Sequence, residues 1–501
     1  MDLSDLIARN AAFTPRKVAI RFQDRALTYA AFADRIAACA RALKSRLGVG
    51  RGDRVAILAA NHPDYLVLLY ACARLGAMLV PLNWRLAVPE QVFILSDASV
   101  KVLVVEQSFA EVIPPLTQAL PDVHVVGLDF VSDSGSFDDL LATGTGDGRN
   151  PHIDFSCPLL LVYTSGTTGR PKGALLRQEA LVWNAAMSQH VHALTSDDHV
   201  LAVLPVFHVG GLNIQTTPAL QLGATVTIHA RFAPDATLSA IAADRPNLIV
   251  LVPATIQALL DHPAWSRTDI SCLRAVTTGS TIVPQALIDA VTARGVPVLQ
   301  VYGATETCPI AVYSRIGGEA RGTGLPGLHC EARIVDDQGR EVPHGTPGEV
   351  VVRGPNVFFE YWGNEAATSE ALRNGWYHTG DIGVRDADGY FTIHDRKKNM
   401  IISGGENIYP AEVERVLHTH PAVKEAAVIG RPDPKWQEVP VAYVVLRDGA
   451  RPAPTELQQH VAAELARFKV PREFVFVDDL PRNVLGKVQH FRLREQANSL
   501  S

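Results

Sequence analysis

The chain has 501 residues, of which 47% are hydrophobic and 20% charged, and its formal net charge is −6. A chain of this length is expected to build more than one compact unit, and its composition is typical of a folded, soluble protein. The negative net charge does not indicate a basic surface, so we expect no nucleic-acid partner.

The cysteines and the N-terminus bear on the cellular compartment. Six cysteines lie far apart without a Cys-x-x-Cys pair, which argues against a disulfide framework or a zinc site. The first six residues are acidic and lack the apolar segment of a secretory signal. The longest apolar runs, such as residues 66–73, are far shorter than the roughly 18 residues of a membrane span. We therefore expect a cytoplasmic protein without a transmembrane segment, and we leave oligomer formation open.

Strand-like and helical segments alternate along the first part of the chain. Thr28 is expected to cap a helix whose apolar residues recur at helical spacing until Gly48 ends it. This alternation predicts layered α/β sheets with mostly parallel strands. Residues 132–150, rich in Gly, Ser, Thr and Asp, are predicted to form a surface loop. Strands are predicted at residues 18–22, 55–58, 78–82 and 100–105.

One stretch carries most of the chemical information, Tyr163-Thr-Ser-Gly-Thr-Thr-Gly-Arg-Pro-Lys-Gly173. It follows an apolar, strand-like run, and its glycines, hydroxyls and amide groups suit a loop that holds a phosphate. It is not a P-loop, because Arg170 and Pro171 separate the second glycine from Lys172. The expected phosphate contacts are Thr164, Ser165, Gly166, Thr167, Thr168, Gly169 and Lys172.

This stretch resembles the phosphate-binding signature of the adenylate-forming superfamily, which includes acyl-CoA synthetases, luciferases and peptide-synthetase adenylation domains. The resemblance extends over nearly the whole chain. It implies an N-terminal AMP-binding domain of layered α/β sheets with a small β subdomain, residues 1–397. It also implies a small, mobile α+β C-terminal domain, residues 398–501, with Lys398 as the hinge.

Further turns follow strand-like runs at residues 275–281 and 300–307. Because ligands in α/β sheets lie beyond the carboxyl ends of strands, we expect these turns to share one crevice with the phosphate loop. A carboxylate there, Glu306, would be repelled by phosphates unless a cation lay between them, so we expect Mg²⁺ at Glu306. The resemblance places adenine at Gly279, Ser280 and Thr281, and it includes Tyr302 and Thr305 in the same nucleotide site.

The remaining candidate residues are spread over the whole chain. Asp381 follows Thr-Gly and can accept hydrogen bonds from ribose hydroxyls, and the resemblance assigns ribose contacts to Asp381 and Arg396. It also makes Lys487 the catalytic lysine. In the family, the residue matching His208 lies at the acyl channel, and the residue matching Arg85 lies near the CoA phosphates. The residues matching Gly404 and Gly405 lie beside the pantetheine tunnel. Gly210 and Gly211 beside His208 would leave room for substrate.

These motifs predict an ATP-dependent carboxylic acid–CoA ligase, an AMP-forming acid–thiol ligase that works through an acyl-adenylate. Its cofactors would be ATP, Mg²⁺ and coenzyme A, with Lys487, His208, Thr305 and Glu306 in the catalytic site. The segments expected at the acyl pocket, 207–212 and 252–255, lack a prominent cation, which disfavours a dicarboxylate. We expect a medium or long-chain fatty acid. The alternatives are an aryl acid, or a stand-alone adenylation enzyme that loads a carrier protein.

Overall fold

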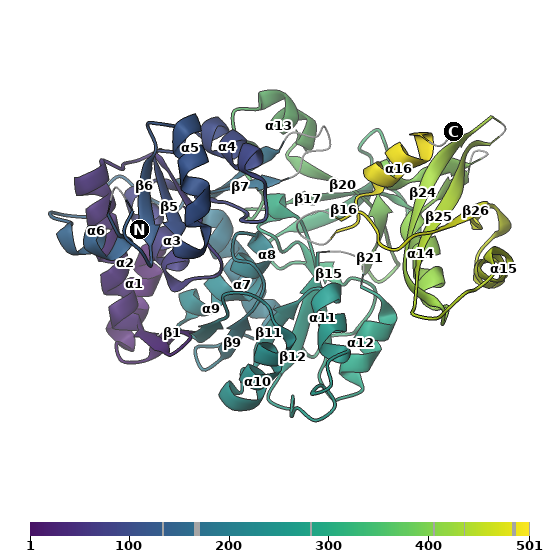
Figure 1. Ribbon diagram of the computed structural model, residues 1–501, viewed down its shortest axis with the longest axis horizontal. Coiled ribbons are helices and arrows are strands. Elements are labelled where there is room, and N and C mark those ends of the chain that lie inside the picture. Colours follow the sequence, from purple (N-terminus) through teal and green to yellow (C-terminus); the bar gives the residue numbers. More distant parts are fainter. Residues whose placement is uncertain are drawn as a thin grey trace. The chain divides into compact units, whose positions relative to one another are not determined.

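The computed structural model describes residues 1–132, 135–164, 171–280, 283–403, 406–434, 436–482 and 487–499. The chain forms two compact units, coloured along the sequence in Figure 1. The first unit comprises Met1–Ser280, Asp289–Ala332 and Val352–His378. The second comprises Thr281–Ile288, Arg333–Val351 and Thr379–Ser501. The mixed α/β class predicted from the sequence is confirmed.

A nine-stranded sheet in the first unit has the order β15-β14-β13-β12-β11-β9-β10-β1-β2. Every neighbouring pair from β13 to β1 is parallel, so the turns that follow these strands emerge at one edge of the sheet. The strands are β1 (Val18–Phe22), β2 (Arg25–Thr28), β9 (His199–Ala202), β10 (Thr225–Ile228), β11 (Leu248–Leu251), β12 (Ala275–Gly279), β13 (Val298–Tyr302), β14 (Val312–Tyr313) and β15 (Leu325–Pro326).

A seven-stranded sheet has the order β18-β8-β7-β4-β3-β5-β6 and carries the phosphate-loop stretch between β7 and β8. Figure 1 shows α4 and α5 beside β5 and β6 of this sheet. The strands are β3 (Arg54–Leu58), β4 (Met78–Pro81), β5 (Val102–Glu106), β6 (His124–Leu128), β7 (Pro158–Thr164), β8 (Lys172–Arg177) and β18 (Glu360–Tyr361).

Helix α3 (Pro63–Leu75) is at the centre of the first unit, because every one of its residues except Arg74 is buried. A helix that is apolar on all sides must be covered on all sides, and α3 packs against α1, α2, β4 and β7. The other helices of this part are α1 (Leu3–Phe13), α2 (Tyr29–Leu47), α4 (Val88–Asp97), α5 (Ile113–Ala119), α6 (Phe137–Thr143), α7 (Gln178–His192), α8 (Val209–Gly211), α9 (Thr217–Leu222), α10 (Pro234–Asp244), α11 (Pro253–Leu260), α12 (Gln285–Thr292) and α13 (Glu365–Ala371).

The predicted ends of α2 are confirmed. The hydroxyl of Thr28 accepts a hydrogen bond from the Ala31 N–H at 3.2 Å, and Gly48 ends the helix with a φ of 60°. A left-handed residue at this position favours glycine, which has no Cβ to clash. None of the described helices is long and apolar enough to cross a bilayer.

The loop predicted for residues 132–150 is wrong for Phe137–Thr143, which form α6. The Ser136 hydroxyl caps this helix by accepting from the Asp139 N–H at 3.1 Å. Phe137 and Leu141, one turn apart, are 1% and 8% exposed. The polar composition of the segment obscured this short apolar face, which the neighbouring α2 covers.

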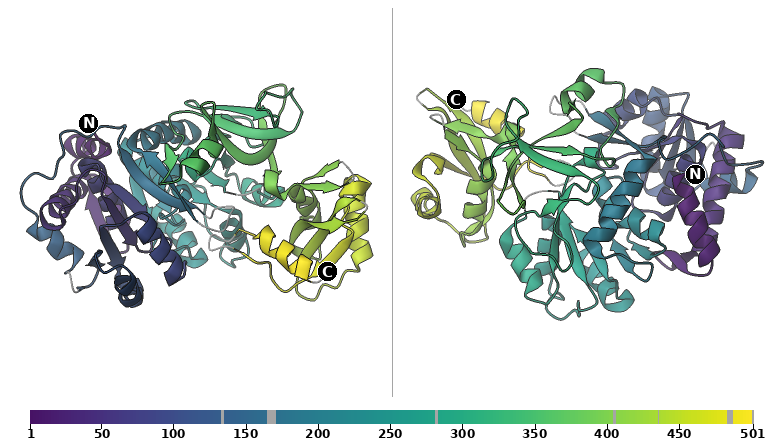
Figure 2. Two further views of the ribbon diagram at one scale, coloured as in Figure 1. Left: turned by 90° about the horizontal axis from the view of Figure 1, so that it is seen from above. Right: turned by 180° about the vertical axis from the view of Figure 1, so that it is seen from behind.

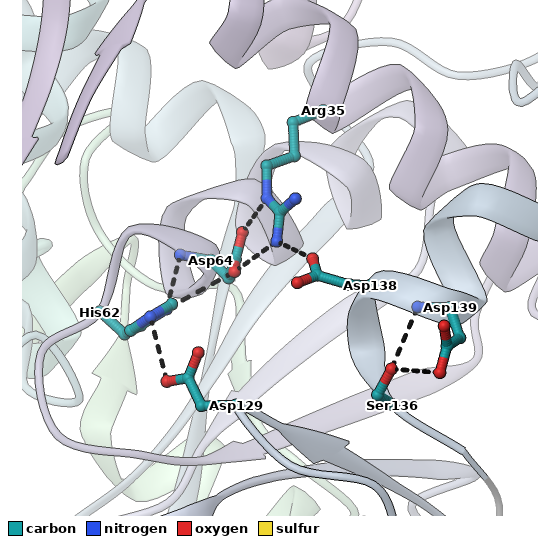
Figure 3. Close-up of polar contacts among 7 residues, drawn as sticks. All are labelled: Arg35, His62, Asp64, Asp129, Ser136, Asp138 and Asp139. Atoms are coloured by element: carbon teal, nitrogen blue, oxygen red, sulfur yellow. Dashed lines mark hydrogen bonds and ion pairs between the residues drawn. The ribbon is translucent and has the colours of Figure 1, made fainter.

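Three helices of the first unit meet at Arg35 of α2 (Figure 3). Its guanidinium donates to both carboxylate oxygens of Asp64 in α3, at 2.7 Å for Nη2 to Oδ2, and at 2.7 Å to Asp138 in α6. The Asp64 side chain is 5% exposed, whereas that of Asp138 is 77% exposed. Burial by itself lowers the pKa of Arg35, but its hydrogen bonds to these carboxylates raise it overall. His62 caps α3 on the other side, where its Nδ1 accepts from the Asp64 N–H at 3.1 Å.

We expect Arg35→Met to lower the free energy of unfolding by about 3 kcal/mol, because it leaves the Asp64 carboxylate buried without its cation. Asp138→Asn removes the exposed branch of the same network and is the matched control, with an expected loss below about 1 kcal/mol. Urea unfolding of both variants and the parent measures the difference. Equal losses in the two variants would contradict the assignment of the stabilising contact to Asp64.

The C-terminal part of the second unit is a five-stranded sheet of order β23-β22-β25-β24 with β26 beside β25, and three helices pack on it (Figure 2). Successive residues of β24 face opposite sides of the sheet. Val428 packs in the cluster that contains Val413 of α14, and Ile429 packs with Leu493 of α16. The elements are β22 (Ile401–Ser403), β23 (Glu406–Ile408), β24 (Val423–Asp433), β25 (Gln437–Leu446), β26 (Glu473–Phe476), α14 (Pro410–His418), α15 (Pro454–Glu464) and α16 (His490–Ser499).

A second five-stranded sheet, of order β16-β17-β20-β19 with β21 beside β20, is formed within residues 331–396. It matches the small β subdomain expected from the sequence. Its strands are β16 (Glu331–Val335), β17 (Gly348–Arg353), β19 (Leu372–Arg373), β20 (Trp376–Arg385) and β21 (Phe391–Arg396).

Candidate functional site

The two ends of the phosphate-loop stretch are held by an antiparallel pair, β7 and β8. Thr164 lies opposite Lys172, and its hydroxyl donates to the Lys172 carbonyl at 3.4 Å. A Cβ on Gly173 would come within 2.8 Å of a Leu161 methyl group and 3.0 Å of the Tyr163 ring, so a larger residue would displace these side chains. The predicted contacts Ser165, Gly166, Thr167, Thr168 and Gly169 lie outside the described residues.

Glu306 lies in a short 3₁₀ turn, Thr305–Thr307, that follows β13. This turn is tightly packed, since a Cβ on Gly303 would come within 1.7 Å of the Pro309 carbonyl oxygen. The fully buried Asn356 donates to the Thr307 carbonyl at 2.9 Å. The Phe358 N–H donates to the Glu306 carbonyl at 2.7 Å. The segment 356–358 therefore holds the backbone of the turn at two successive carbonyls, those of Glu306 and Thr307.

Tyr361 joins this turn to the phosphate-loop strands. Its hydroxyl donates to Oε1 of Glu306 at 2.7 Å, and Lys172 Nζ lies 5.4 Å from the centre of its ring. Tyr361 reaches this place because β18 pairs with β8, opposite Ala174. The Glu306 residue is 7% exposed, and the tyrosine occupies only one of its carboxylate oxygens.

Tyr361 and Asn356 were not predicted from the sequence as parts of the site. Neither lies in a motif, and Tyr361 is in a strand of only two residues. An alternating pattern cannot identify so short a strand, because it needs several residues to show a period. Only the pairing of β18 with β8 brings Tyr361 to Glu306.

The donor set around Glu306 suits the magnesium that accompanies ATP. Mg²⁺ usually takes one or two protein carboxylates and fills its other positions with phosphate oxygens and water. Glu306 has one carboxylate oxygen held by Tyr361 and a second one that could bind a cation, and Lys172 places a positive charge beside the same tyrosine. Across the described ranges no group of three or more His, Cys, Asp or Glu side chains could hold a metal ion.

The turn expected to hold adenine begins at the end of β12. A Cβ on Gly279 would come within 2.2 Å of the Val301 carbonyl oxygen, so β12 and β13 approach too closely for any other residue. Ser280 follows in a left-handed conformation with a φ of 73°. Tyr302 ends the neighbouring strand β13, while Thr281 lies outside the described part of the chain. The described residues thus place the expected adenine turn beside the strand that leads to Glu306.

A buried histidine supports β12 from below this turn. The Nδ1 of His192 in α7 lies 2.8 Å from the Ser188 carbonyl, and its Nε2 lies 2.9 Å from the Thr277 hydroxyl. Burial lowers the pKa of His192 to about 4, so the ring is neutral. It therefore donates to Ser188 through Nδ1 and accepts from Thr277 through Nε2. Gln215 donates to the same hydroxyl at 3.2 Å, which joins a third segment to the network.

His208 is the N-cap residue of α8. Its Nδ1 accepts from the Gly210 N–H at 3.0 Å, which orients the ring and places the proton of the neutral form on Nε2. A Cβ on Gly211 would lie 2.3 Å from the Pro205 carbonyl oxygen. The turn itself therefore requires a glycine at position 211. The sequence had suggested a different reason for this glycine, namely space for the substrate.

The predicted ribose ligands in the second unit are direct neighbours, because β20 and β21 pair Asp381 with Arg396. Arg396 Nε lies 2.7 Å from Oδ1 of Asp381, which is 5% exposed. The Thr379 hydroxyl accepts from the Asp381 N–H at 3.1 Å. These two contacts fix the orientation of the Asp381 carboxylate and its backbone.

The expected hinge and the expected catalytic lysine also lie in the second unit. Lys398 is in a 3₁₀ turn, and its carbonyl accepts from Arg494 at 3.0 Å. Burial, and the charges of Arg396 and Arg494, lower the pKa of Lys398. Lys487 is half-buried shortly before α16. Gly404 and Gly405 lie outside the described residues.

Comparison with known proteins identifies the class. The family model "AMP-binding enzyme" matches residues 7–362, and "AMP-binding enzyme C-terminal domain" matches residues 412–487. The chain is 48% identical to the indoleacetate–CoA ligase of Aromatoleum aromaticum, over 99% of this chain and 98% of that one. It is 42% identical to a feruloyl-CoA synthase of an Amycolatopsis species, over 97% of each. The crystal structure of the anthranilate CoA ligase AuaEII with anthranoyl-AMP superposes with a TM-score of 0.92 at 29% identity, covering 99% of this chain and 97% of that one.

The chain therefore belongs to the AMP-binding enzyme family. It is an acid–CoA ligase that acts through an acyl-adenylate, with a carboxylic acid and CoA as substrates. This confirms the predicted superfamily, the enzyme class and the cofactors ATP, Mg²⁺ and CoA.

We expect Tyr361→Phe to raise the Mg²⁺ concentration for half-maximal pyrophosphate release by at least about tenfold, because a hydrogen bond to a charged group contributes about 1.5–3 kcal/mol. Without it the Glu306 carboxylate is no longer oriented. Tyr443→Phe in β25 removes a hydroxyl far along the chain and is the control. A magnesium titration of pyrophosphate release that is the same for Tyr361→Phe and the parent would exclude a positioning role for Tyr361.

Proposed function

We propose that this ligase activates an aromatic carboxylic acid, of the arylacetic or arylacrylic kind, and transfers it to CoA. The observation that carries the proposal is the 48% identity over 99% of the chain to a ligase named for indoleacetate. The feruloyl-CoA synthase and the anthranoyl-AMP complex point to the same class of acid. The fatty acid favoured by the sequence analysis becomes the second candidate.

The residues near His208 are compatible with an aromatic acid. Leu204, Ile214 and Val250 form a buried apolar cluster with Val252 against it, and Phe207 beside His208 is 5% exposed. Apolar side chains bind a ring or an alkyl chain, and they disfavour a second carboxylate. The choice of a ring over an alkyl chain therefore rests on the relatives.

In the proposed first step, a substrate carboxylate oxygen attacks the α-phosphorus of ATP. The bond to the bridging oxygen breaks, pyrophosphate leaves, and the acyl-adenylate forms. The protein contributes mainly position and charge to such a reaction. Lys487 would neutralise the α-phosphate and the carboxylate, and Lys172 with the rest of residues 164–172 would hold the leaving phosphates. Glu306 would hold Mg²⁺, which neutralises phosphate charge.

The other predicted residues have positioning roles in this proposal. Gly279, Ser280 and Tyr302 would border adenine, while Asp381 and Arg396 would hold the ribose. Thr305 would lie beside the phosphates at the Glu306 turn, and His208 would line the acyl channel.

In the second step the CoA thiol attacks the acyl carbonyl, its proton passes to solvent, and AMP leaves. Arg85 would contact the CoA phosphates, and Gly404 and Gly405 would flank the pantetheine. We also propose the domain boundary at residues 397/398, with Lys398 as the hinge between the two steps. A carrier protein as thiol acceptor, the alternative kept from the sequence, is disfavoured because relatives at 48% and 42% identity are CoA ligases.

An acid panel tests the substrate class. We expect indole-3-acetate, phenylacetate and ferulate to support ATP-dependent hydroxamate formation with hydroxylamine at least about tenfold faster than octanoate or palmitate, a difference of about 1.4 kcal/mol. The same acids with CoA and with a phosphopantetheine-loaded carrier protein distinguish the two thiol acceptors. A preference for the fatty acids would overturn the aromatic assignment and leave the ligase class intact.

Lys487→Ala should reduce pyrophosphate release by at least about a hundredfold, because its charge is needed as negative charge builds up around the α-phosphorus. Transfer from a supplied acyl-adenylate to CoA should remain within about threefold of the parent. The exposed Lys424→Ala in the same unit is the control. Similar losses in the two half-reactions, measured under single-turnover conditions, would show that Lys487 has no specific role in adenylation.

A further inference from the structure

A buried glutamine, Gln215, lies in the π-helical turn Leu212–Thr216. Turns of this kind are rare and frequently occur at functional sites. The Ser188 hydroxyl of α7 donates to the carbonyl of the preceding residue, Ile214, at 2.6 Å. Asn184, one turn earlier in α7, donates to the carbonyl before that one at 2.6 Å. Two successive carbonyls are thus anchored, which fixes the backbone that carries Gln215.

The hydrogen bonds of Thr277 fix the orientation of the Gln215 amide. His192 Nδ1 faces a carbonyl and therefore carries the proton of the neutral ring, so its Nε2 accepts from the Thr277 hydroxyl. Because that hydroxyl has used its proton, it can only accept from the Gln215 amide. The amide nitrogen therefore lies 3.2 Å from it, and the amide oxygen, Oε1, is turned away.

This amide oxygen is buried, and no donor among the described residues reaches it. The whole Gln215 residue is 1% exposed. A buried acceptor without a donor costs free energy, because it has lost its water partners and gained nothing, and such groups are rare in folded proteins. Oε1 of Gln215 is therefore an acceptor that a ligand can satisfy.

Gln215 lines a small cavity beside the apolar cluster of the proposed acyl pocket. The volume of the cavity is about 10 Å³, which is room for one water-sized group. Leu204 and Val250 line this cavity and also belong to the apolar cluster, together with Ile214. Val250 lies opposite Thr277 in the pairing of β11 with β12, so the two side chains face the same side of the sheet. The apolar cluster and the Thr277 network therefore meet at this cavity.

The lining limits the kind of group that the cavity can take. Among the described residues that line it, the polar side chains are Gln215 and Thr216, and the Thr216 hydroxyl donates to the Gly211 carbonyl at 2.7 Å. A ligand hydroxyl would need a donor for its own oxygen, whereas the N–H of an indole-type ring only donates. A single acceptor in apolar surroundings therefore matches a ring N–H.

We propose that Gln215 accepts a hydrogen bond from a ring N–H of the acyl group, so that the ligase selects an indole-type arylacetic acid over an acid of the same shape without that donor. The inference rests on the proposed function and names the ring that the acid carries. The ring packs against Leu204, Ile214 and Val250, and its N–H edge enters the cavity. A site that hydrogen-bonds a substrate group rejects the analogue without it, because the buried partner is then left unpaired.

The test compares indole-3-acetate with benzothiophene-3-acetate, in which sulfur replaces the ring N–H with little change of shape. We expect kcat/KM for hydroxamate formation by the parent to be at least about a hundredfold higher with the indole acid. Gln215→Met keeps the length of the side chain without an acceptor, and we expect it to reduce this ratio to below about fivefold through a loss with the indole acid. Ser188→Ala removes another hydrogen bond of the same buried network and is the matched control. It should leave the ratio unchanged even if both activities fall.

Equal kcat/KM values for the two acids in the parent would overturn the assignment, and this comparison decides even if Gln215→Met does not fold. An equal fall of the ratio in Ser188→Ala would also overturn it. A preference for 4-hydroxyphenylacetate over phenylacetate as large as the indole preference would show that the site takes a hydroxyl, against the choice of a ring N–H. If the parent forms no hydroxamate with any of these aromatic acids, the proposed function itself fails, a result distinct from equal activity with the two bicyclic acids.

Discussion

The buried carboxylate of Glu306 is the constraint on which the first unit depends. A charged group removed from water needs compensation, and this one has a tyrosine hydroxyl on one oxygen and Lys172 near that tyrosine. The turn beneath it must not move, and Gly303 allows the close packing while Asn356 holds the carbonyls. In the proposed mechanism the same arrangement orients the carboxylate toward the cation that accompanies the phosphates.

The scaffold behind this turn is rigid for a related reason. The edge where the parallel strands end presents Gly279 and Ser280 beside Tyr302, and the strands approach so closely that Gly279 tolerates no Cβ. His192 joins α7 to β12 while it stays neutral, so it adds hydrogen bonds without adding a buried charge. The residues of the candidate site therefore lie at the ends of strands. Close packing and hydrogen bonds between uncharged groups fix the positions of these strand ends.

The two units carry different parts of the chemistry. The first holds the phosphate-loop strands and Glu306, while the second holds the Asp381–Arg396 pair, Lys398 and Lys487. The contact between Arg494 and the Lys398 carbonyl then makes α16 part of the expected hinge.

The sequence by itself determined the class of protein, and it predicted the parts of the site that are contiguous. A phosphate loop can be recognised without a fold, because its glycines, hydroxyls and lysine are neighbours in the chain, and the ends of α2 follow from local capping at Thr28 and Gly48. Only the tertiary structure brought Tyr361 to Glu306, because a two-residue strand has no period and its pairing with β8 sets its place. The same holds for Gln215 beside Thr277 and for α6, whose partners lie far along the chain. Contacts between distant segments depend on strand pairing and side-chain packing, which no local pattern records.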